Sequence, residues 1–403
     1  MKKDINNFIK NHVTNRDESI FVNDLKKFNS VLSKRISKKS VLVIGGGGTI
    51  GSNFIKALLK FKIKKLVVVD INENGLTELV RDLRSSGDYN IPNDFITYPI
   101  DFGSIVFEKM FKTHGPFEIV SNFAAHKHVR SEKDIFSIEA MIKNNVIKAR
   151  KLLELLIDFP PEHFFCVSTD KAANPVNLMG ASKKLMEELI MSYSNKIQIK
   201  TARFANVAFS NGSLLIGFLD RLSKNQPWSC PLGIKRFFVS PEESGQLCLI
   251  ACIMGESGDI FYPKLKKSDM ISFDSIALDL LKFLNLEPRI CKSENEARNL
   301  GKFINHNSKN YPIYFFDSDT SGEKTFEEFY TDDEILDTDS FEKLGVIKNS
   351  SNLNFTDIDS MFMEIEYIFS NNNLKKSELV NVIKKYLPNF DHIETGKNLD
   401  QKM

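Results

Sequence analysis

The chain alternates short apolar runs with stretches in which apolar residues recur every three or four positions. Residues 41–44 and 66–69 are uninterrupted apolar runs rich in β-branched residues, as in strands buried on both faces of a sheet. Ile50, Phe54 and Leu58 between them have helical spacing. Short buried strands that alternate with amphipathic helices predict an α/β fold built on a doubly wound parallel sheet, with functional residues at the carboxyl ends of the strands.

The same alternation continues to about residue 205 and then loosens. We expect further strands at 95–100, 118–122, 164–168 and 197–202, and helices at 146–156, 180–194, 275–284 and 377–387. The pattern divides the chain into a basic N-terminal extension, a cofactor-binding sheet domain, a smaller mixed α/β substrate-binding part and a helical tail. The N-terminal extension is expected at 1–39. The cofactor-binding domain is expected at 40–210, with 240–265 returning to it. The substrate-binding part is expected at 211–239 and 266–348, and the helical tail at 349–403.

Charge and composition limit the classes of partner. The 54 Lys and Arg residues nearly balance 52 Asp and Glu residues, for a net charge of +2, which argues against a protein that coats nucleic acid. No apolar run approaches the roughly 20 residues of a membrane span, and the basic start lacks the apolar core of a signal peptide. We therefore expect a soluble, cytoplasmic protein without stable membrane insertion.

Three other features have structural interpretations. The basic segment 1–39 is expected to pack on the body or on a second subunit. Residues 317–342 are strongly acidic, which usually indicates a solvated face, and Thr331 and Glu334 have the spacing of a capping box at a helix start. The five cysteines lack a Cys-x-x-Cys pair, so neither a disulfide framework nor a metal site is expected.

The first functional motif is the glycine-rich segment 45–51, Gly-Gly-Gly-Gly-Thr-Ile-Gly, between a predicted strand and a predicted helix. Backbone N–H groups at a helix N-terminus, with no Cβ in the way, can bind a pyrophosphate. Asp70 ends the next strand, where a carboxylate accepts hydrogen bonds from an adenosine ribose and repels a 2′-phosphate. The motif predicts a Rossmann-type site for NAD, with NADP less favoured. The loop residues expected at the cofactor are Gly45, Gly48, Thr49, Ile50 and Gly51.

The second motif places proton-transfer groups at another strand end. Thr169, Asp170 and Lys171 follow the predicted strand 164–168, and Lys183 lies in the helix that begins soon afterwards. A lysine near a nicotinamide can hold its ribose and shift neighbouring pKa values. The alternative is structural, with the aspartate capping a helix and both lysines solvated.

Together with the glycine loop, segment 168–183 resembles the extended short-chain dehydrogenase/reductases, and among them the nucleotide-sugar 4,6-dehydratases of bacterial polysaccharide and glycan biosynthesis. The superfamily's usual Tyr-x-x-x-Lys is Met179-x-x-x-Lys183 here, and Met at that position is a feature of the UDP-N-acetylglucosamine 4,6-dehydratase branch. Further matches follow in order at 122–129, 145–146, 203–213, 236–238 and 321–328. The likeness is strong over 40–265 and thinner to about 348.

The resemblance implies an internal redox elimination and a role for each residue of the second motif. A hydride leaves sugar C4 for NAD, water is eliminated across C5–C6, and the hydride returns to C6. Asp170 would be the acid for the C6 hydroxyl, and Lys171 the C5 base, which requires a lowered pKa. Thr169 would bind the C4 oxygen, and Lys183 would hold the nicotinamide ribose.

Other positions are assigned to the two ligands. On the cofactor side we expect Asn72, Asp101, Phe102, Ala124 and Asn145, in addition to the glycine loop and Asp70. On the substrate side we expect Lys127, Asn206, Ser213 and Arg236. The expected partners are a nucleotide-sugar substrate and further copies of the chain, in a homo-oligomer of two or more subunits.

The chain also departs from the family pattern. The family usually has Arg-Pro before Gly-Glu-Lys, whereas this chain has Asp319-Thr320-Ser321, and Asn122 stands where a His is common. Two other functions stay open: a nucleotide-sugar 4- or 5-epimerase of the same fold, which oxidises C4 without expelling water, and a non-catalytic NAD-binding scaffold. The adjacent Asp170 and Lys171 argue against the scaffold, because nucleotide binding alone does not need them.

Overall fold

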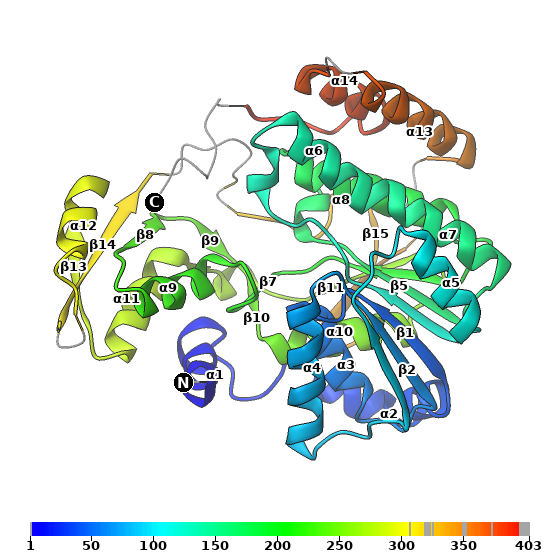
Figure 1. Ribbon diagram of the computed structural model, residues 1–403, viewed down its shortest axis with the longest axis horizontal. Helices are drawn as coiled ribbons and strands as arrows, with labels where there is room; N and C mark the ends of the chain where they lie inside the picture. Colours follow the sequence, from blue (N-terminus) through cyan, green and yellow to red (C-terminus); the bar gives the residue numbers. More distant parts are fainter. Residues whose placement is uncertain are drawn as a thin grey trace.

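A parallel sheet with helices on both faces forms the larger part of the molecule (Figure 1). The computed structural model describes residues 2–305, 308–317, 324, 326–348, 353–371 and 374–394. Within these residues the large sheet has nine strands in the order β15-β16-β11-β6-β5-β4-β1-β2-β3. The strands are β1 (Ser40–Ile44), β2 (Lys65–Val69), β3 (Asp94–Tyr98), β4 (Ile119–Asn122), β5 (His163–Val167), β6 (Ile199–Ala202), β11 (Asp259–Pro263), β15 (Ile335–Asp337) and β16 (Leu344–Lys348).

Along the sheet, β3, β2, β1, β4, β5, β6 and β11 each pair in parallel with the next strand. At the edge, β16 pairs antiparallel with β11, and β15 pairs antiparallel with β16. The order 3-2-1-4-5-6 of the first six strands is that of a Rossmann fold. Residues 41–44 are almost completely buried, as the continuous apolar run predicts. The predicted doubly wound sheet is therefore confirmed.

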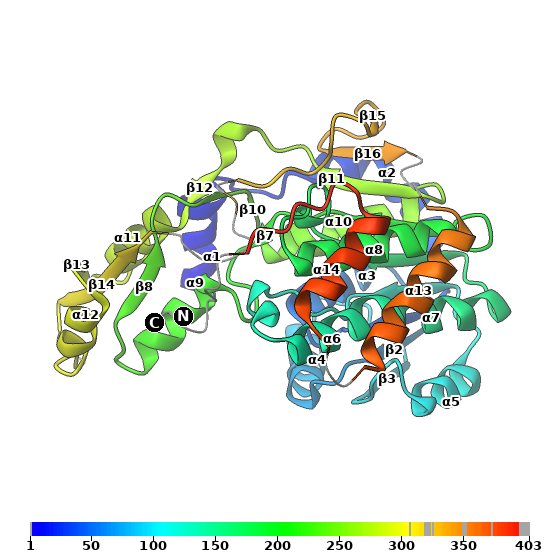
Figure 2. The same ribbon diagram turned by 90° about the horizontal axis from the view of Figure 1, so that it is seen from above.

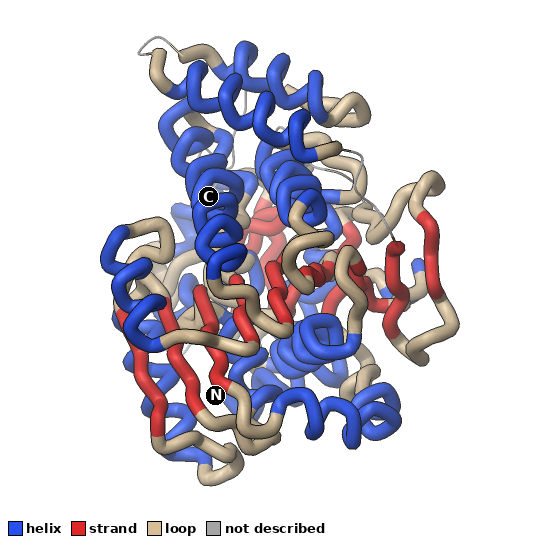
Figure 3. Tube along the Cα trace, turned by 90° about the vertical axis from the view of Figure 1, so that its right-hand side faces the viewer, coloured by secondary structure: helices blue, strands red, loops and turns tan. Residues whose placement is uncertain are grey.

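Two layers of helices cover this sheet, as the end-on view in Figure 3 shows. One layer contains α3 (Thr49–Leu58), α4 (Glu73–Ser86) and α10 (Pro241–Met254), and the other contains α5 (Ile105–His114), α7 (Lys148–Asp158) and α8 (Leu178–Ser192). The predicted helix 180–194 is α8, and it begins two residues earlier because Asn177 caps it by accepting a hydrogen bond from the Gly180 N–H.

A smaller lobe lies beside the carboxyl ends of the large sheet (Figures 1 and 2). Its parallel three-stranded sheet has the order β13-β14-β8, and Trp228 of β8 stacks on Phe218 in its core. The elements of this lobe are α9 (Leu214–Ser223), β8 (Trp228–Pro231), α11 (Phe273–Phe283), β13 (Glu287–Cys291), α12 (Glu294–Gly301) and β14 (Asn310–Phe316). The short pairs β7–β10 and β9–β12 comprise β7 (Asn206–Val207), β9 (Lys235–Arg236), β10 (Phe238–Val239) and β12 (Ile271–Ser272).

The N-terminal extension connects the two lobes. Phe8, at the end of α1 (Lys2–Phe8), is buried in the core of the smaller lobe, whereas α2 (Val22–Ile36) packs beside α10 on the large sheet domain. Between them, Arg16 donates two hydrogen bonds to the Glu243 carboxylate, at 2.9 and 2.7 Å. This basic segment therefore serves as a packed structural element.

The C-terminal part forms a helical hairpin over the side of the molecule that carries α6 (Ile135–Ile142), α7 and α8 (Figure 1). The hairpin consists of α13 (Phe355–Phe369) and α14 (Lys376–Tyr386), and α14 confirms the predicted helix at 377–387. The expected helix start at Thr331 is wrong, because a turn follows and leads into β15. In the described part of the chain, no helix has both the length and the apolar composition that crossing a bilayer requires.

Candidate active site

The glycine loop connects β1 to α3 and leaves no room for a side chain at Gly45 or Gly51. Gly45 has φ +77°, and a Cβ there would lie 2.5 Å from the Ala124 nitrogen. A Cβ on Gly51 would lie 2.3 Å from the Gly45 carbonyl oxygen. No side chain caps the start of α3 at Gly48, so the N–H groups of its first turn, at Thr49, Ile50 and Gly51, have no acceptor within the helix. The loop therefore has the backbone geometry that an anionic pyrophosphate requires.

Asp70 lies at the end of β2 and faces this loop. Its carboxylate accepts hydrogen bonds from the Gly47 N–H at 2.8 Å and the Asn72 N–H at 2.9 Å. Asn72 in turn caps α4 by accepting from the Gly75 N–H. The structure thus confines Asp70 beside the loop, where its remaining acceptor positions are available to a ribose.

Asp101 follows β3 and is engaged by Lys148 of α7, at 2.5 Å, and by the Gly103 N–H, at 2.8 Å. Burial opposes ionisation of Asp101, but these two donors hold its pKa below the ordinary value. The Lys148 ammonium also lies 5.7 Å from the ring centre of the buried Phe102. Asp101 and Phe102, both predicted at the cofactor, therefore each contact Lys148 within the protein.

Two asparagines organise the chain after β4. The Asn122 side chain accepts a hydrogen bond from the Ala124 N–H at 3.0 Å. The buried Asn145 accepts from the His126 N–H and donates to the His126 carbonyl, both at 2.9 Å, and also donates to Ser182 of α8. Asn145 lies in a π-helical turn, a feature frequent at functional sites. It holds the loop that carries Ala124 against α8.

The proton-transfer groups occupy the carboxyl end of β5. Thr169 donates to the Asp170 carboxylate at 2.8 Å, and the Lys171 ammonium lies 3.1 Å from the same carboxylate oxygen. Asp170 is buried, with 4% exposure. The predicted cluster of hydroxyl, carboxylate and ammonium is therefore assembled in one place.

Glu327 is a member of this cluster that the sequence did not single out for a role. Its carboxylate lies 3.6 Å from the Lys171 ammonium and 4.0 Å from the Arg236 guanidinium. Arg236 also donates to the Lys324 carbonyl at 2.9 Å. Glu327 is only 5% exposed, so the expectation of a solvated face for the acidic segment is wrong at this position. The sequence signal was the Glu-Glu of the family-like segment 321–328, of which 321–323 and 325 lie outside the described residues.

The expected lowering of the Lys171 pKa is also wrong for this arrangement. Burial by itself would lower the pKa of Lys171, but the carboxylates of Asp170 and Glu327 outweigh burial and raise it. Burial raises the pKa of Glu327, against the effect of the Lys171 charge. Lys171 is therefore an ammonium held between two carboxylates.

Lys183 and Met179 lie in the first turns of α8. The Lys183 ammonium donates to the Val167 carbonyl at 2.7 Å, and burial lowers its pKa. Met179 is buried and offers no hydroxyl, while its backbone N–H donates to Glu132 at 2.9 Å. Lys183 is thus anchored directly behind the strand end that carries Thr169.

The remaining predicted substrate residues are Lys127 on the loop after β4, Asn206 in β7 and Ser213 at the start of α9. The Lys127 ammonium donates to the Asn211 carbonyl at 3.0 Å, and the Asn211 N–H donates to the Thr49 hydroxyl at 2.9 Å. Ser213 caps α9, which gives it a structural role. The Asn206 side-chain nitrogen is buried and has no hydrogen-bond partner among the described residues.

A buried network of charged side chains lies next to the Thr169–Asp170–Lys171 cluster. Arg203, which is completely buried, binds Glu187 of α8 and Glu334 with two hydrogen bonds each, between 2.8 and 3.0 Å. Glu187 also accepts from Ser168, next to Thr169. Burial opposes the charge on Arg203, but the two carboxylates raise its pKa. The network connects the segment of Glu327 to the end of β5.

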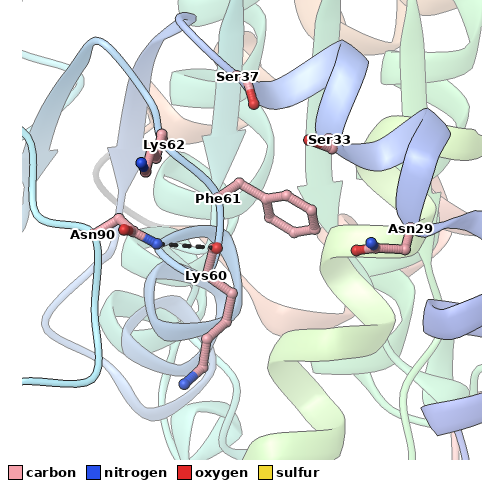
Figure 4. Close-up of a pocket in the computed structure, with 7 residues that line it drawn as sticks. All are labelled: Asn29, Ser33, Ser37, Lys60, Phe61, Lys62 and Asn90. Carbon is pink, nitrogen blue, oxygen red and sulfur yellow. Dashed lines mark hydrogen bonds between the residues drawn. The ribbon is translucent and has the colours of Figure 1, made fainter.

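The hollow in Figure 4 lies at the opposite edge of the sheet, next to the amino ends of β1, β2 and β3. Its volume is about 340 Å³. It is lined by Asn29, Ser33, Ser37, Lys60, Phe61, Lys62 and Asn90. None of the predicted site residues lines this hollow, and the candidate active site is at the carboxyl edge.

Sheet order and glycine loop place the chain in the class of Rossmann-type proteins. The chain belongs to the family described as polysaccharide biosynthesis protein, whose model matches residues 41–349. This region includes the large sheet, the glycine loop and the cluster around Lys171, and the resemblance expected from the sequence is thus confirmed.

Several known proteins are similar to this chain. An uncharacterized membrane protein of Methanocaldococcus jannaschii is 30% identical over 78% of the chain and 87% of its own length. The probable polysaccharide biosynthesis protein EpsC of Bacillus subtilis is 29% identical over 79% of the chain, which spans only 49% of that longer relative. An inverting UDP-N-acetylglucosamine 4,6-dehydratase of Campylobacter jejuni is 26% identical over 57% of the chain and 68% of its own length.

Solved structures give the same fold. The structure of Pen from Bacillus thuringiensis has a TM-score of 0.63 and 21% identity, over 87% of this chain and 98% of that one. At this identity the likeness establishes the architecture alone.

Proposed function

We propose that the protein is a nucleotide-sugar 4,6-dehydratase that acts on a UDP-N-acetylglucosamine-like substrate in glycan or polysaccharide biosynthesis. The observation that carries this proposal is the Asp170–Lys171 pair, with 3.1 Å between ammonium and carboxylate, at the carboxyl end of β5. Removal of water from a sugar needs an acid for the leaving hydroxyl and a base for the adjacent carbon. The family supports a role in polysaccharide biosynthesis, and the similarity to the Campylobacter dehydratase supports the proposed reaction.

The residues present fit a nicotinamide dinucleotide. A Cβ at Gly45 would clash with the Ala124 backbone and one at Gly51 with the Gly45 carbonyl oxygen, so the loop can pack this tightly only with glycine at both positions. The N–H groups of the first turn of α3, which follows the loop, suit a pyrophosphate. Asp70 at the end of β2 favours an unphosphorylated ribose, and therefore NAD over NADP. When bound, the nicotinamide would take a hydride from the sugar and return it.

A proton shift within the ion pair would create the two groups that elimination needs. Asp170 as acid must carry a proton, and Lys171 as base must be neutral. These states differ from the ion pair only by transfer of one proton from the Lys171 nitrogen to the Asp170 oxygen. Exclusion of water by a bound substrate favours the neutral pair, because desolvation disfavours both charges. Thr169, which donates to the same carboxylate, is proposed to turn to the C4 oxygen.

Glu327 and Arg236 are proposed to shift the balance between the charged and the neutral form of the Asp170–Lys171 pair. Glu327 stabilises the ammonium form of Lys171 until substrate arrives, and Arg236 faces Glu327 from β9. Lys183, now anchored to the Val167 carbonyl, is proposed to reach the nicotinamide ribose. Lys127 and Asn206 are proposed on the substrate side, where the unpaired Asn206 amide supports the assignment.

A 4-epimerase of the same fold is the second candidate. UDP-glucose 4-epimerases, such as that of Rickettsia rickettsii at 28% identity, are also similar to this chain. Against it stands Met179, which has no hydroxyl at the position where the superfamily usually has Tyr.

Incubation of the purified protein with UDP-N-acetylglucosamine and other nucleotide sugars, followed by mass spectrometry, tests the proposal. We expect a product lighter by one water without added reductant. A product of unchanged mass that separates from the substrate by chromatography would point to epimerisation, and a bound dinucleotide with no turnover of any sugar would favour the scaffold.

A further inference from the structure

The C-terminal segment lies outside the region that the family model matches, yet it is packed on that region. Asp359 of α13 pairs with Arg150 of α7 at 2.6 Å, and the same guanidinium lies 4.6 Å from the ring centre of Phe362. Ile383 of α14 is completely buried. After α14 the chain turns back toward the smaller lobe (Figures 1 and 2). We call residues 388–394 of this returning segment the strap.

The strap is attached to the loop between Lys171 and α8. Its Ile393 N–H donates to the Val176 carbonyl at 3.0 Å, and Phe390 is buried with 2% exposure. Glu394 pairs with Lys376 at the start of α14. The strap therefore contacts the backbone that leads from the candidate catalytic pair into the helix of Lys183.

His392 of the strap faces the carboxylate that helps to cap this helix. One Glu132 oxygen accepts from the Met179 N–H at 2.9 Å, and the other lies 3.9 Å from His392 Nε2. Both side chains are less than a tenth exposed. Neither that second oxygen nor His392 Nε2 has a hydrogen-bond partner among the described residues. Burial of two polar atoms without hydrogen-bond partners lowers the stability of the fold, unless the two atoms interact with each other.

We propose that His392 is a positioning residue for the candidate active site. It acts through Glu132, whose contact with Met179 orients the first turn of α8 and, one turn further on, Lys183. The consequence for catalysis rests on the function proposed above, whereas the positioning itself does not.

Hydrogen exchange of the full-length protein tests the positioning directly. In His392→Ala we expect the amides of 176–183 to exchange about tenfold faster, because a cap contact of α8 is loosened, with unchanged exchange over 40–58. His392→Gln, whose amide can still donate to Glu132, should restore slow exchange. Asp391→Ala, an exposed change in the same strap, is the matched control and should leave 176–183 unchanged.

Three outcomes would overturn the proposal. They are wild-type exchange over 176–183 in His392→Ala, no rescue by His392→Gln, and equally faster exchange over 40–58. If His392→Ala does not fold, the comparison is made with His392→Phe, which keeps an aromatic ring but cannot donate to Glu132. His392→Phe should also speed exchange over 176–183, and wild-type exchange in this variant would overturn the proposal as well.

Turnover gives the second readout. With a nucleotide sugar that the wild type converts, His392→Ala should lower kcat about tenfold at nearly unchanged KM, and His392→Gln should recover most of it. Unchanged kcat, or a rise confined to KM, would contradict the catalytic consequence. If the wild type converts no nucleotide sugar, the proposed function fails while the exchange experiment still decides the role of His392.

Discussion

Replacement of Glu327 by Gln removes one of the two charges that hold Lys171 as an ammonium, while the side chain keeps its size. The carboxylate lies 3.6 Å from the Lys171 nitrogen. Two charges about 4 Å apart interact by about 4 kcal/mol at an effective dielectric constant of about 20. At about 1.4 kcal/mol per pKa unit, this gives an upper bound of about 3 units for the change in the Lys171 pKa.

The sign follows from the causes of the shift. The pKa of Lys171 is raised because Asp170 and Glu327 outweigh burial, so loss of the Glu327 charge lowers it. The proposed reactive pair, neutral Lys171 with protonated Asp170, holds the same single proton as the ion pair, so activity is lost as pH rises through this pKa and the pair gives up that proton. In the variant, this loss of activity at high pH moves to lower pH. The side chain of Lys171 is 18% exposed, and this solvent access weakens the interaction, so we expect a displacement of about 1 pH unit, below the upper bound.

The assay is the pH profile of kcat/KM for water loss, measured for wild type, Glu327→Gln and Glu328→Gln. Glu328 is the matched control because it is the neighbouring glutamate, is exposed, and accepts a hydrogen bond from the Asn174 side chain at 3.0 Å. An amide at 328 can still accept that bond. A Glu327→Gln profile that does not move, or that moves to higher pH, would refute Lys171 as the base.

The remaining predictions concern the chemistry, the cofactor loop and the stability of the fold. Lys171→Ala should keep its dinucleotide but lose exchange of the sugar C5 proton with solvent; deuterium uptake at C5 in D₂O would exclude Lys171 as the base. Gly45→Ala should abolish dinucleotide binding measured by calorimetry, since its φ is +77° and a Cβ would lie 2.5 Å from the Ala124 nitrogen; wild-type affinity would contradict this. Arg203→Met should lower the free energy of unfolding by about 3–5 kcal/mol in urea titrations, because Glu187 and Glu334 lose their buried partner; an unchanged midpoint would show that the network is dispensable.

The architecture was largely predictable because a parallel sheet with both faces covered has an unmistakable pattern. Its buried strands are continuous apolar runs such as 41–44, and its helices follow at regular intervals. The ends of helices were harder to predict from the sequence. Thr331 and Glu334 have capping-box spacing, yet the Glu334 side chain binds the Thr331 N–H and Arg203 in a turn before β15. Tertiary contact with a buried guanidinium thus outweighs the local preference.

The residue types at the site were predictable, but their electrostatics were not. The adjacent Asp170 and Lys171 are visible in the sequence, whereas Glu327 reaches Lys171 only through the fold. The sign of the Lys171 pKa shift depends on this distant partner, and a reading of adjacent residues alone could not supply it. In the same way, the pairing of Asp101 with Lys148 depends on the fold, which brings the start of α7 to the loop after β3.

The position of the C-terminal segment was also inaccessible to sequence reasoning. An amphipathic helix at 377–387 is evident from the sequence pattern, but the surface against which it packs is not. The approach of His392 to Glu132 depends on the path of the chain after α14, which no periodic pattern encodes.

The central claim is that the protein eliminates water from a nucleotide sugar by an internal hydride transfer. UDP-N-acetylglucosamine labelled with deuterium at C4 tests it most directly, with NMR of the product after incubation with the purified protein. The account predicts a product that has lost water and carries the deuterium at C6. Deuterium that stays at C4 in a product of unchanged composition would contradict it and identify an epimerase.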